Sequence, residues 1–444
     1  MRTSLLALCF SAFLLTPAVG FAQQQARVLP AGVWHSEGYG YVAVVDRRRV
    51  RTFDLSAAGC VRGPTYTLSD FHNYFGRVTT ESGGNVVLNR SPTRDTVREL
   101  ERLPASCRRP LRASDHNQNI SIFSQTFAEF YPFFHERGVD WQAATNAARL
   151  RSDEDLFEVL ADMVQPLNDG HVTIAAGERS LDLETVSAPG AALDGAPWAW
   201  RSLRASLRDY VQSAETPLQS PAILSGNRRV LYGRLAGNIG YFAPLAMGAW
   251  AEGQTEDTPS DQHAAAAASV MDQILNELSD ARGMVIDLRL NSGGFDAVAM
   301  EVVSRFAAQR TLAFRKHAAD GNVYDVYLEP SQSRGFDGPV VILIGDNTVS
   351  AGETAALAFA SLPNAHLLGQ PTRGILSDAI PKTLPNGWTY TLSIESVLTP
   401  EGALVEVVGV QPDEMTSSAE APEPELLWGR DILAAAAWLR TRMN

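Results

Sequence analysis

One serine stands where a buried strand is expected to turn into a helix. The apolar run 339–345 predicts the strand, and the residues from Ser350 to about Ser361 predict the helix. The small residues Ala351 and Gly352 follow the serine, so a substrate backbone could come close to its hydroxyl. The unpaired amides of a first helical turn can also stabilise developing negative charge. Ser350 is therefore a candidate nucleophile, and its alternative role is that of an N-cap.

Two further segments carry groups that such a serine would need. Gly293 and Gly294 follow the apolar strand predicted at 283–289, and a glycine pair can present a backbone N–H to an oxyanion without obstruction. His171 follows a tight Asp-Gly turn, and imidazole is the commonest general base. Each signal is weak alone, because glycine pairs end many strands and a lone histidine is more often a surface or core residue.

Five motifs follow one another along the chain. They are Asp-Gly-His at 169–171, Asp-Leu-Arg-Leu-Asn-Ser-Gly-Gly at 287–294, Ser-Ala-Gly-Glu at 350–353, Gly-Gln-Pro-Thr-Arg-Gly at 369–374 and Glu-Val-Val-Gly-Val-Gln-Pro-Asp at 406–413. In this order they resemble the C-terminal-processing (tail-specific) serine peptidases, especially the branch with the tricorn protease core and the interphotoreceptor retinoid-binding protein modules. The resemblance begins near residue 120 and is interrupted over 176–232. It implies a crotonase/ClpP-like α/β core and peptide hydrolysis by a serine nucleophile, with no cofactor.

The resemblance also implies roles for particular residues. Ser350 matches the nucleophile of the family. The amide of Ala351, together with that of Gly293 or Gly294, matches the oxyanion hole. Many relatives carry a PDZ domain before the core, but the interval 176–232 is too short and too rich in alanine and proline for one.

The general base distinguishes two branches of this family. The tail-specific branch uses a lysine shortly after the serine, but Arg373 stands in that region here, and arginine stays protonated. The only lysines are Lys316 and Lys382, and Lys382, between a proline and a turn, is expected in a solvated loop. The tricorn-like branch uses a histidine and a glutamate, which match His171 and Glu406. The resemblance thus implies a Ser–His–Glu site in which Glu406 orients His171.

Changes in composition along the chain predict five segments. These are a signal peptide at 1–22, a small β-rich domain at 23–115, a helical domain carrying the Asp-Gly-His motif at 116–175, a linker or lid at 176–232, and an α/β peptidase core at 233–444. The first segment combines an arginine, a short apolar run and small residues before a cleavage point, so export to the periplasm or the cell exterior is expected. The fold class expected is an α/β catalytic core preceded by a helical segment and a small β domain.

The mature chain keeps two cysteines, Cys60 and Cys107. An even number in an oxidising compartment favours one disulfide, and the alternative is two unrelated buried thiols.

Charge and composition limit the partners. Fifty acidic against thirty-seven basic side chains give a formal charge of -13, which disfavours nucleic acid and anionic membrane surfaces. No His-x-x-x-His pair or close cysteine pair predicts a metal site. No long apolar run follows the signal peptide, so stable membrane insertion is not expected. The expected partner is a peptide or protein substrate, and the oligomeric state stays open.

Two other functions remain open from the sequence. Retinoid-binding relatives use this fold to hold apolar ligands, so the chain could be an exported lipid- or peptide-binding module with a silent site. Acyl transfer to serine also serves esters, so a serine esterase is the second alternative.

Overall fold

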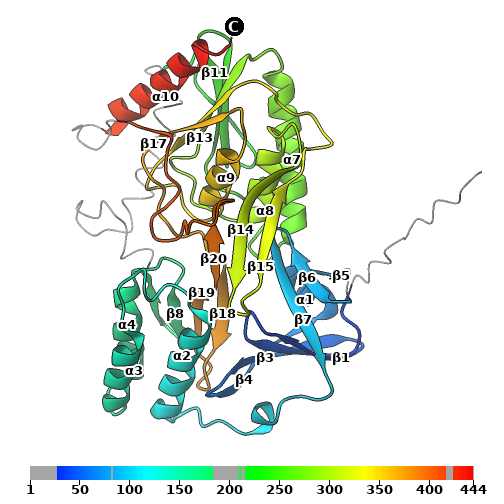
Figure 1. Cartoon of the computed structure of the whole chain (residues 1–444), viewed down its shortest axis with the longest axis vertical. Coiled ribbons are helices and arrows are strands. Elements are labelled where there is room, and N and C mark those ends of the chain that lie inside the picture. The colour runs from blue at the N-terminus through cyan, green and yellow to red at the C-terminus, as the bar shows by residue number, and fades with distance from the viewer. Residues whose placement is uncertain are drawn as a thin grey trace, which may run out of the picture.

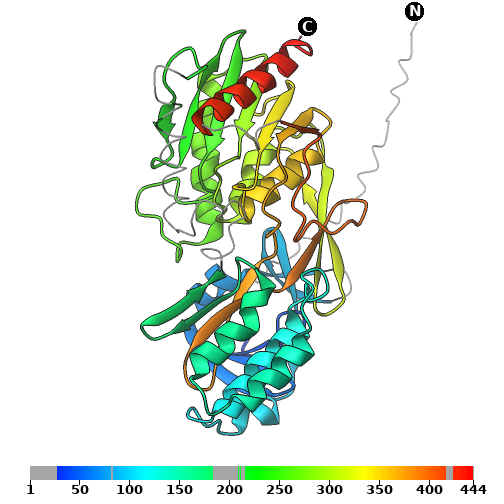
Figure 2. The same ribbon diagram turned by 90° about the vertical axis from the view of Figure 1, so that its left-hand side faces the viewer.

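The computed structural model describes residues 28–81, 84–183, 209, 211, 216–416 and 424–443. The predicted signal peptide and most of the predicted linker or lid lie outside the described residues. The N-terminal strands and the helices that follow them occupy one end of an elongated molecule, and the core that contains Ser350 occupies the other (Figures 1 and 2).

The N-terminal segment forms a seven-stranded antiparallel sheet with strand order β4-β3-β2-β1-β7-β6-β5. Its elements are β1 (Gly32–Ser36), β2 (Tyr41–Val45), β3 (Arg49–Ser56), β4 (Gly59–Thr67), α1 (Leu68–Phe75), β5 (Arg77–Thr80), β6 (Val86–Arg90) and β7 (Thr93–Leu100). In β3 the buried Val50 and Thr52 alternate with the exposed Arg49 and Arg51, because successive side chains of a strand point to opposite faces. A Cys60–Cys107 disulfide joins β4 to the 3-10 helix η1 (Ala105–Arg108), so the predicted bridge is confirmed.

Three helices pack beside this sheet. They are α2 (His116–Phe130), α3 (Trp141–Leu150) and α4 (Leu156–Val164), and the short helix η2 (Gln165–Leu167) follows α4. Asp155 caps α4, its side chain accepting hydrogen bonds from the N–H groups of Phe157 and Glu158. The buried side chains of the sheet and of the helices form one continuous hydrophobic core.

Two small sheets connect the two ends of the molecule. One has the order β18 (Ala379–Thr383), β19 (Thr389–Ser393), β8 (Thr173–Ala176), β9 (Arg179–Asp182), and the other the order β15 (Val323–Leu328), β14 (Thr311–Ala318), β20 (Glu395–Leu398). In the first sheet β8 pairs with β19, which lies more than 200 residues later in the chain. Because β8 begins just after His171, this pairing brings the histidine to the core.

The core sheet has the order β10-β11-β12-β13-β16-β17-β21, and it is parallel from β12 to β21. Its strands are β10 (Ile223–Ser225), β11 (Val230–Leu235), β12 (Ile239–Pro244), β13 (Gly283–Asp287), β16 (Val340–Ile344), β17 (Ala365–Gly369) and β21 (Glu414–Met415). The helices are α7 (Ser260–Glu277), α8 (Asp296–Ser304), α9 (Ala351–Ala360) and α10 (Pro424–Arg440). Helices cover both faces, so the predicted α/β core is confirmed.

Successive side chains of the central strands point to opposite faces of the core sheet, and different helices cover each face. Ile286 and Ile342 belong to the hydrophobic cluster that includes α7, α8 and α9. Val285 and Val341 belong to the cluster on the opposite face, which includes α10. The parallel neighbours β13 and β16 end at the same edge of the sheet, where the chain continues to Gly293 and Ser350. This edge is where an α/β sheet offers a site.

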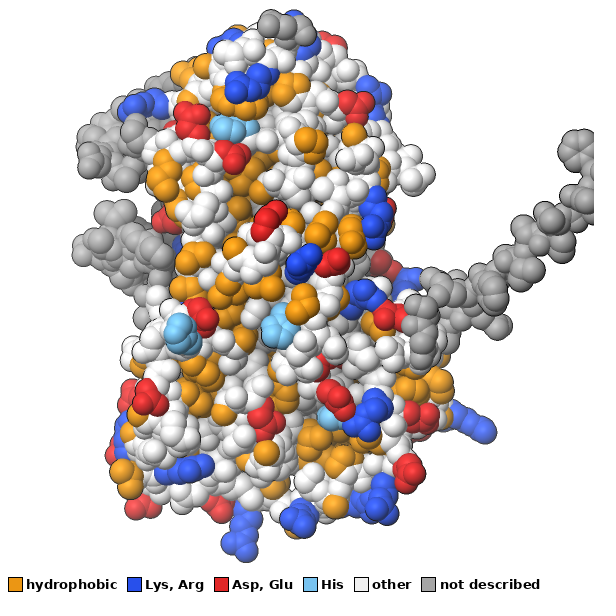
Figure 3. All heavy atoms as spheres, in the orientation of Figure 1, with side chains coloured by type: hydrophobic (Ala, Val, Ile, Leu, Met, Phe, Trp, Pro, Cys, Tyr) orange, Lys and Arg blue, Asp and Glu red, His pale blue; other side chains and the backbone are white. Residues whose placement is uncertain are grey.

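The surface in Figure 3 carries scattered charges of both signs. Blue arginine and lysine side chains are separated by red carboxylates, and no continuous basic surface covers the described residues on this face.

Candidate functional site

Ser350 occupies a sharp turn between β16 and α9. Its backbone has φ 53° and ψ −123°, a conformation that is unfavourable for a residue with a side chain. Its N–H donates to Oε2 of Glu353 at 3.1 Å, and the N–H of Glu353 donates to the carbonyl oxygen of Ser350 at 2.7 Å. Surrounding hydrogen bonds therefore hold the serine in a conformation that the isolated chain would rarely adopt.

The two candidate glycines differ in what their amides do. The N–H of Gly293 already donates to Oδ1 of Asn291 at 2.9 Å. Gly294 is exposed, and among the described residues neither its N–H nor that of Ala351 donates a hydrogen bond. Gly293 lies directly against the serine, because a Cβ added to it would be 2.7 Å from Cβ of Ser350. Gly293 thus permits the close packing against Ser350, while the N–H groups of Gly294 and Ala351 are available to donate a hydrogen bond.

Ser350, His171 and Gly294 line the same cavity, which has a volume of about 240 Å³. Ser377 and Asp378, from the loop before β18, line it as well. Three of its residues come from the N-terminal sheet and its β6–β7 turn, namely Arg90, Ser91 and Thr93. Sequence reasoning did not find these three, and no local pattern marks them.

The backbone of His171 is firmly held. Its N–H donates to Oδ1 of Asp169 at 2.9 Å, and its carbonyl oxygen accepts a hydrogen bond from Oγ1 of Thr391 at 2.7 Å. Asp169 is completely buried and also accepts from the hydroxyl groups of Tyr131 and Ser393, each at 2.9 Å. The ring atom Nδ1 of His171 is buried and has no hydrogen-bond partner in the described part of the chain.

Glu406 is buried behind the loop that contains Ser377. Its Oε2 accepts hydrogen bonds from the N–H groups of Leu376 at 2.7 Å and Ser377 at 3.0 Å. Its Oε1 lies 3.5 Å from the guanidinium of Arg137 and, within the described residues, accepts no hydrogen bond. Burial, and then the neighbouring carboxylates of Asp169 and Glu353, raise the pKa of Glu406 well above its ordinary value. The described residues contain no hydrogen bond between Glu406 and His171.

The prediction for Lys382 is wrong. Lys382 lies in β18 with 1 % of its surface exposed, and its Nζ donates to the carbonyl oxygens of Tyr39 at 2.6 Å and Gly40 at 2.9 Å. Asp54 lies 3.6 Å from the same atom, and burial lowers the pKa of the ammonium group. The sequence suggested a solvated loop because the polar partners of Lys382, namely Tyr39, Gly40 and Asp54, are more than 300 positions away.

Lys316 is equally buried and contacts two of the carboxylates that line the cavity. Its Nζ lies 3.0 Å from Glu395, 3.2 Å from Asp378 and 3.3 Å from Asp296. Neither lysine belongs to the described residues that line the cavity of Ser350.

Two further features are absent from the described residues. No three histidine, cysteine, aspartate or glutamate side chains there are grouped as a metal site. In the same part of the chain, no helix is both long and apolar enough to cross a membrane.

Comparison with known proteins finds proteins that are similar to part of this chain. Residues 249–416 match the family described as Peptidase family S41. A carboxy-terminal-processing protease of Bartonella bacilliformis is 27% identical over 211 residues, which cover 47% of this chain and 44% of that protein. The carboxy-terminal processing protease CtpA of Bacillus subtilis is 27% identical over 147 residues, covering 33% of this chain and 30% of the relative. The chain thus spans less than half the length of these curated relatives.

Solved structures share the fold. A putative peptidase from Parabacteroides merdae has a TM-score of 0.55 and 21% identity, with 74% of this chain and 97% of that chain covered. Mature CPAF in complex with lactacystin has a TM-score of 0.53 and 12% identity, with 74% and 99% covered. Residues 249–416 thus match the model of Peptidase family S41, and part of the chain is similar in sequence to C-terminal-processing proteases.

Proposed function

We propose that this protein is an exported serine peptidase that hydrolyses peptide bonds with Ser350 as nucleophile and His171 as general base. The observation that carries the proposal is the cavity shared by Ser350, His171 and Gly294, with the serine held at a positive φ. The family relationship of residues 249–416 supports the same chemistry.

The steps follow from the chemistry of these groups. His171 accepts the proton of the Ser350 hydroxyl as Oγ attacks the scissile carbonyl, and the N–H groups of Ala351 and Gly294 donate to the oxyanion. The imidazolium then gives its proton to the leaving amine, which departs as the acyl-enzyme forms. Water, deprotonated by His171, hydrolyses the ester and restores the serine.

Glu406 acts in this proposal as a positioning residue. It fixes the amides of Leu376 and Ser377, and Ser377 lines the cavity. Its Oε1 and Nδ1 of His171 are both buried and lack hydrogen-bond partners among the described residues. A hydrogen bond between them in the substrate complex would satisfy both atoms and stabilise the imidazolium.

The test compares the wild-type protein with Ser350→Ala. We expect wild type to react with a fluorophosphonate at Ser350 and to cleave β-casein, and the variant to do neither. Loss of the hydroxyl should change the free energy of unfolding by only about 1 kcal/mol, so the variant should stay folded. Ser361→Ala, at the other end of α9, is the matched control and should behave as wild type.

Three outcomes would change the assignment. Turnover of p-nitrophenyl acetate without cleavage of β-casein would favour an esterase. Absence of labelling in folded wild type would favour a binding module with a silent site. Normal cleavage by folded Ser350→Ala would remove Ser350 from the mechanism.

A further inference from the structure

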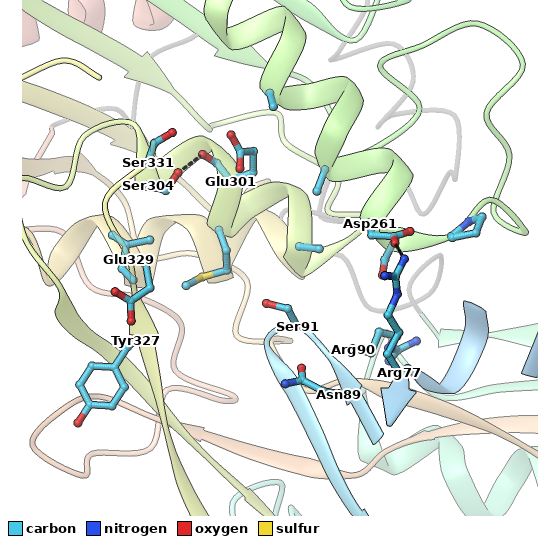
Figure 4. A pocket seen from close by; sticks show the side chains of 18 of the residues that line it. Arg77, Asn89, Arg90, Ser91, Asp261, Glu301, Ser304, Tyr327, Glu329 and Ser331 are labelled. Carbon is cyan, nitrogen blue, oxygen red and sulfur yellow. Dashed lines mark hydrogen bonds and ion pairs between the residues drawn. The ribbon is translucent and has the colours of Figure 1, made fainter. Parts of the chain in front are cut away.

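A groove lies between the N-terminal sheet and the α/β core. Its volume is about 740 Å³. On one side it is lined by the end of α1, the start of β5 and the end of β6, and on the other by α7, α8 and the segment 327–333. Figure 4 shows Asn89 on β6 and Ser91 in the β6–β7 turn of the N-terminal sheet, with Glu301, Ser304 and Ser331 across the groove.

This groove continues into the cavity of Ser350. Arg90, Ser91, Ser260 and Ala297 line both of them. Because the groove and the cavity share these four residues, they form one path along the surface. A polypeptide lying in the groove would therefore reach Ser350.

The N-terminal wall of the groove is fixed to the core by a buried polar cluster. The Thr93 hydroxyl donates to Asp378, and Tyr39 donates to Glu395. Both carboxylates also contact the buried Nζ of Lys316 on β14. Breaking such a buried cluster is strongly unfavourable, so the wall should keep its position relative to Ser350.

Side chains that line the groove can form hydrogen bonds with the main chain of a bound polypeptide. Asn89, Ser91 and Ser331 offer hydrogen-bonding side chains, and Arg77 pairs with Asp261 where the two walls meet (Figure 4). The lining also contains apolar side chains, among them Met300 and Leu328. An extended polypeptide presents a donor and an acceptor at every residue and matches such a surface.

We propose that the groove binds an extended polypeptide segment of the substrate, to one side of the bond attacked, and that the N-terminal sheet is its substrate-binding wall. The inference rests on the proposed peptidase function. It assigns the N-terminal sheet a role that the sequence did not indicate.

The experiment narrows the groove with a large side chain from either wall. Asn89→Trp acts from β6 and Ser331→Trp from the opposite wall. Asn85→Trp is the matched control, because Asn85 precedes the same strand but is exposed outside the groove. Binding of fluorescein-labelled β-casein is measured by anisotropy in the Ser350→Ala background. Circular dichroism and thermal unfolding show whether each variant is folded.

We expect both groove variants to raise the Kd for casein at least about tenfold, the size of a typical important contact, and the control to leave it unchanged. In groove variants that keep Ser350, the rate of fluorophosphonate labelling should stay within about twofold of wild type, since the small reagent does not need the groove.

Two results would overturn the groove assignment. They are unchanged casein binding in folded variants from both walls, or no casein binding by the parent protein. Failure of the peptidase function looks different, because Ser350 would then not react with the fluorophosphonate while the variants still weaken casein binding.

Discussion

The buried carboxylate of Glu353 accepts a hydrogen bond from the backbone N–H of Ser350, at 3.1 Å. Its other hydrogen bonds come from Thr372, Gly374 and Ile375, at 2.6 to 3.0 Å. One side chain thus ties the turn of the candidate nucleophile to the loop at 372–375.

Glu353→Gln should destabilise the protein and misplace Ser350. The amide replaces one acceptor oxygen by a donor that faces other donors, and each buried N–H left without an acceptor costs about 1–3 kcal/mol. Urea unfolding gives the stability, and the rate of fluorophosphonate labelling reports on Ser350. Wild-type stability and labelling in this variant would show that the network is dispensable.

His171→Ala should lower turnover about 10²- to 10⁴-fold, because it removes the proton acceptor. Glu406→Gln should lose less, since the base remains and the amide oxygen can still accept from Leu376 and Ser377. Steady-state cleavage of β-casein measures both variants. A larger loss in Glu406→Gln than in His171→Ala would contradict these roles.

Lys382→Met should destabilise the protein by about 3–5 kcal/mol without removing the nucleophile. The substitution removes the ammonium group beside Asp54 and the lysine donor of the Tyr39 carbonyl oxygen, while the Gly40 carbonyl oxygen keeps only the N–H of Leu55. Thermal unfolding should show the loss, and the folded fraction should still react with the fluorophosphonate. Lys382→Met with Asp54→Asn should recover part of the stability. A stable Lys382→Met protein that no longer reacts would instead indicate a lysine base.

Asp95 should make stability depend on pH. Burial raises its pKa to about 7, although the Ser36 and Tyr41 hydroxyl groups donate to it. The nearby Asp320 and Glu395 act in the same direction as burial. Because the folded state holds this proton more tightly than the unfolded state, its contribution is complete below about pH 4 and is lost as the pH rises to about 7.

Asp95→Asn should therefore flatten the pH dependence of the melting temperature between about pH 4 and 7. Tm measured at half-unit pH steps in wild type and variant checks this. Parallel curves would show that Asp95 does not titrate in that range.

Reduction of Cys60–Cys107 should lower stability by about 4 kcal/mol in the chain-entropy model, because the bridge closes a loop with a sequence separation of 47. Mass spectrometry of the alkylated, unreduced protein tests the bridge itself, and thermal unfolding with and without reductant tests its effect. Two alkylatable thiols in the folded protein would mean that the bridge is absent in solution.

The sequence by itself determined the parts of this protein that depend on neighbouring residues. An apolar strand followed by Ser350 and small residues predicts the strand–turn–helix, and glycines after the neighbouring strand predict a second loop beside it. These loops meet because adjacent parallel strands end at one edge of a sheet. The cysteine count favoured the bridge over two separate thiols, since only one pairing remains after the predicted cleavage point.

Only the tertiary structure decided the rest. His171 reaches the cavity through the pairing of β8 with β19, and Arg90 enters it from a sheet whose position the sequence did not indicate. Lys382 is buried by Tyr39, Gly40 and Asp54, which lie far away in the chain. Periodicity and turn chemistry report interactions within a few residues, whereas burial and the lining of a cavity depend on which distant surfaces pack together.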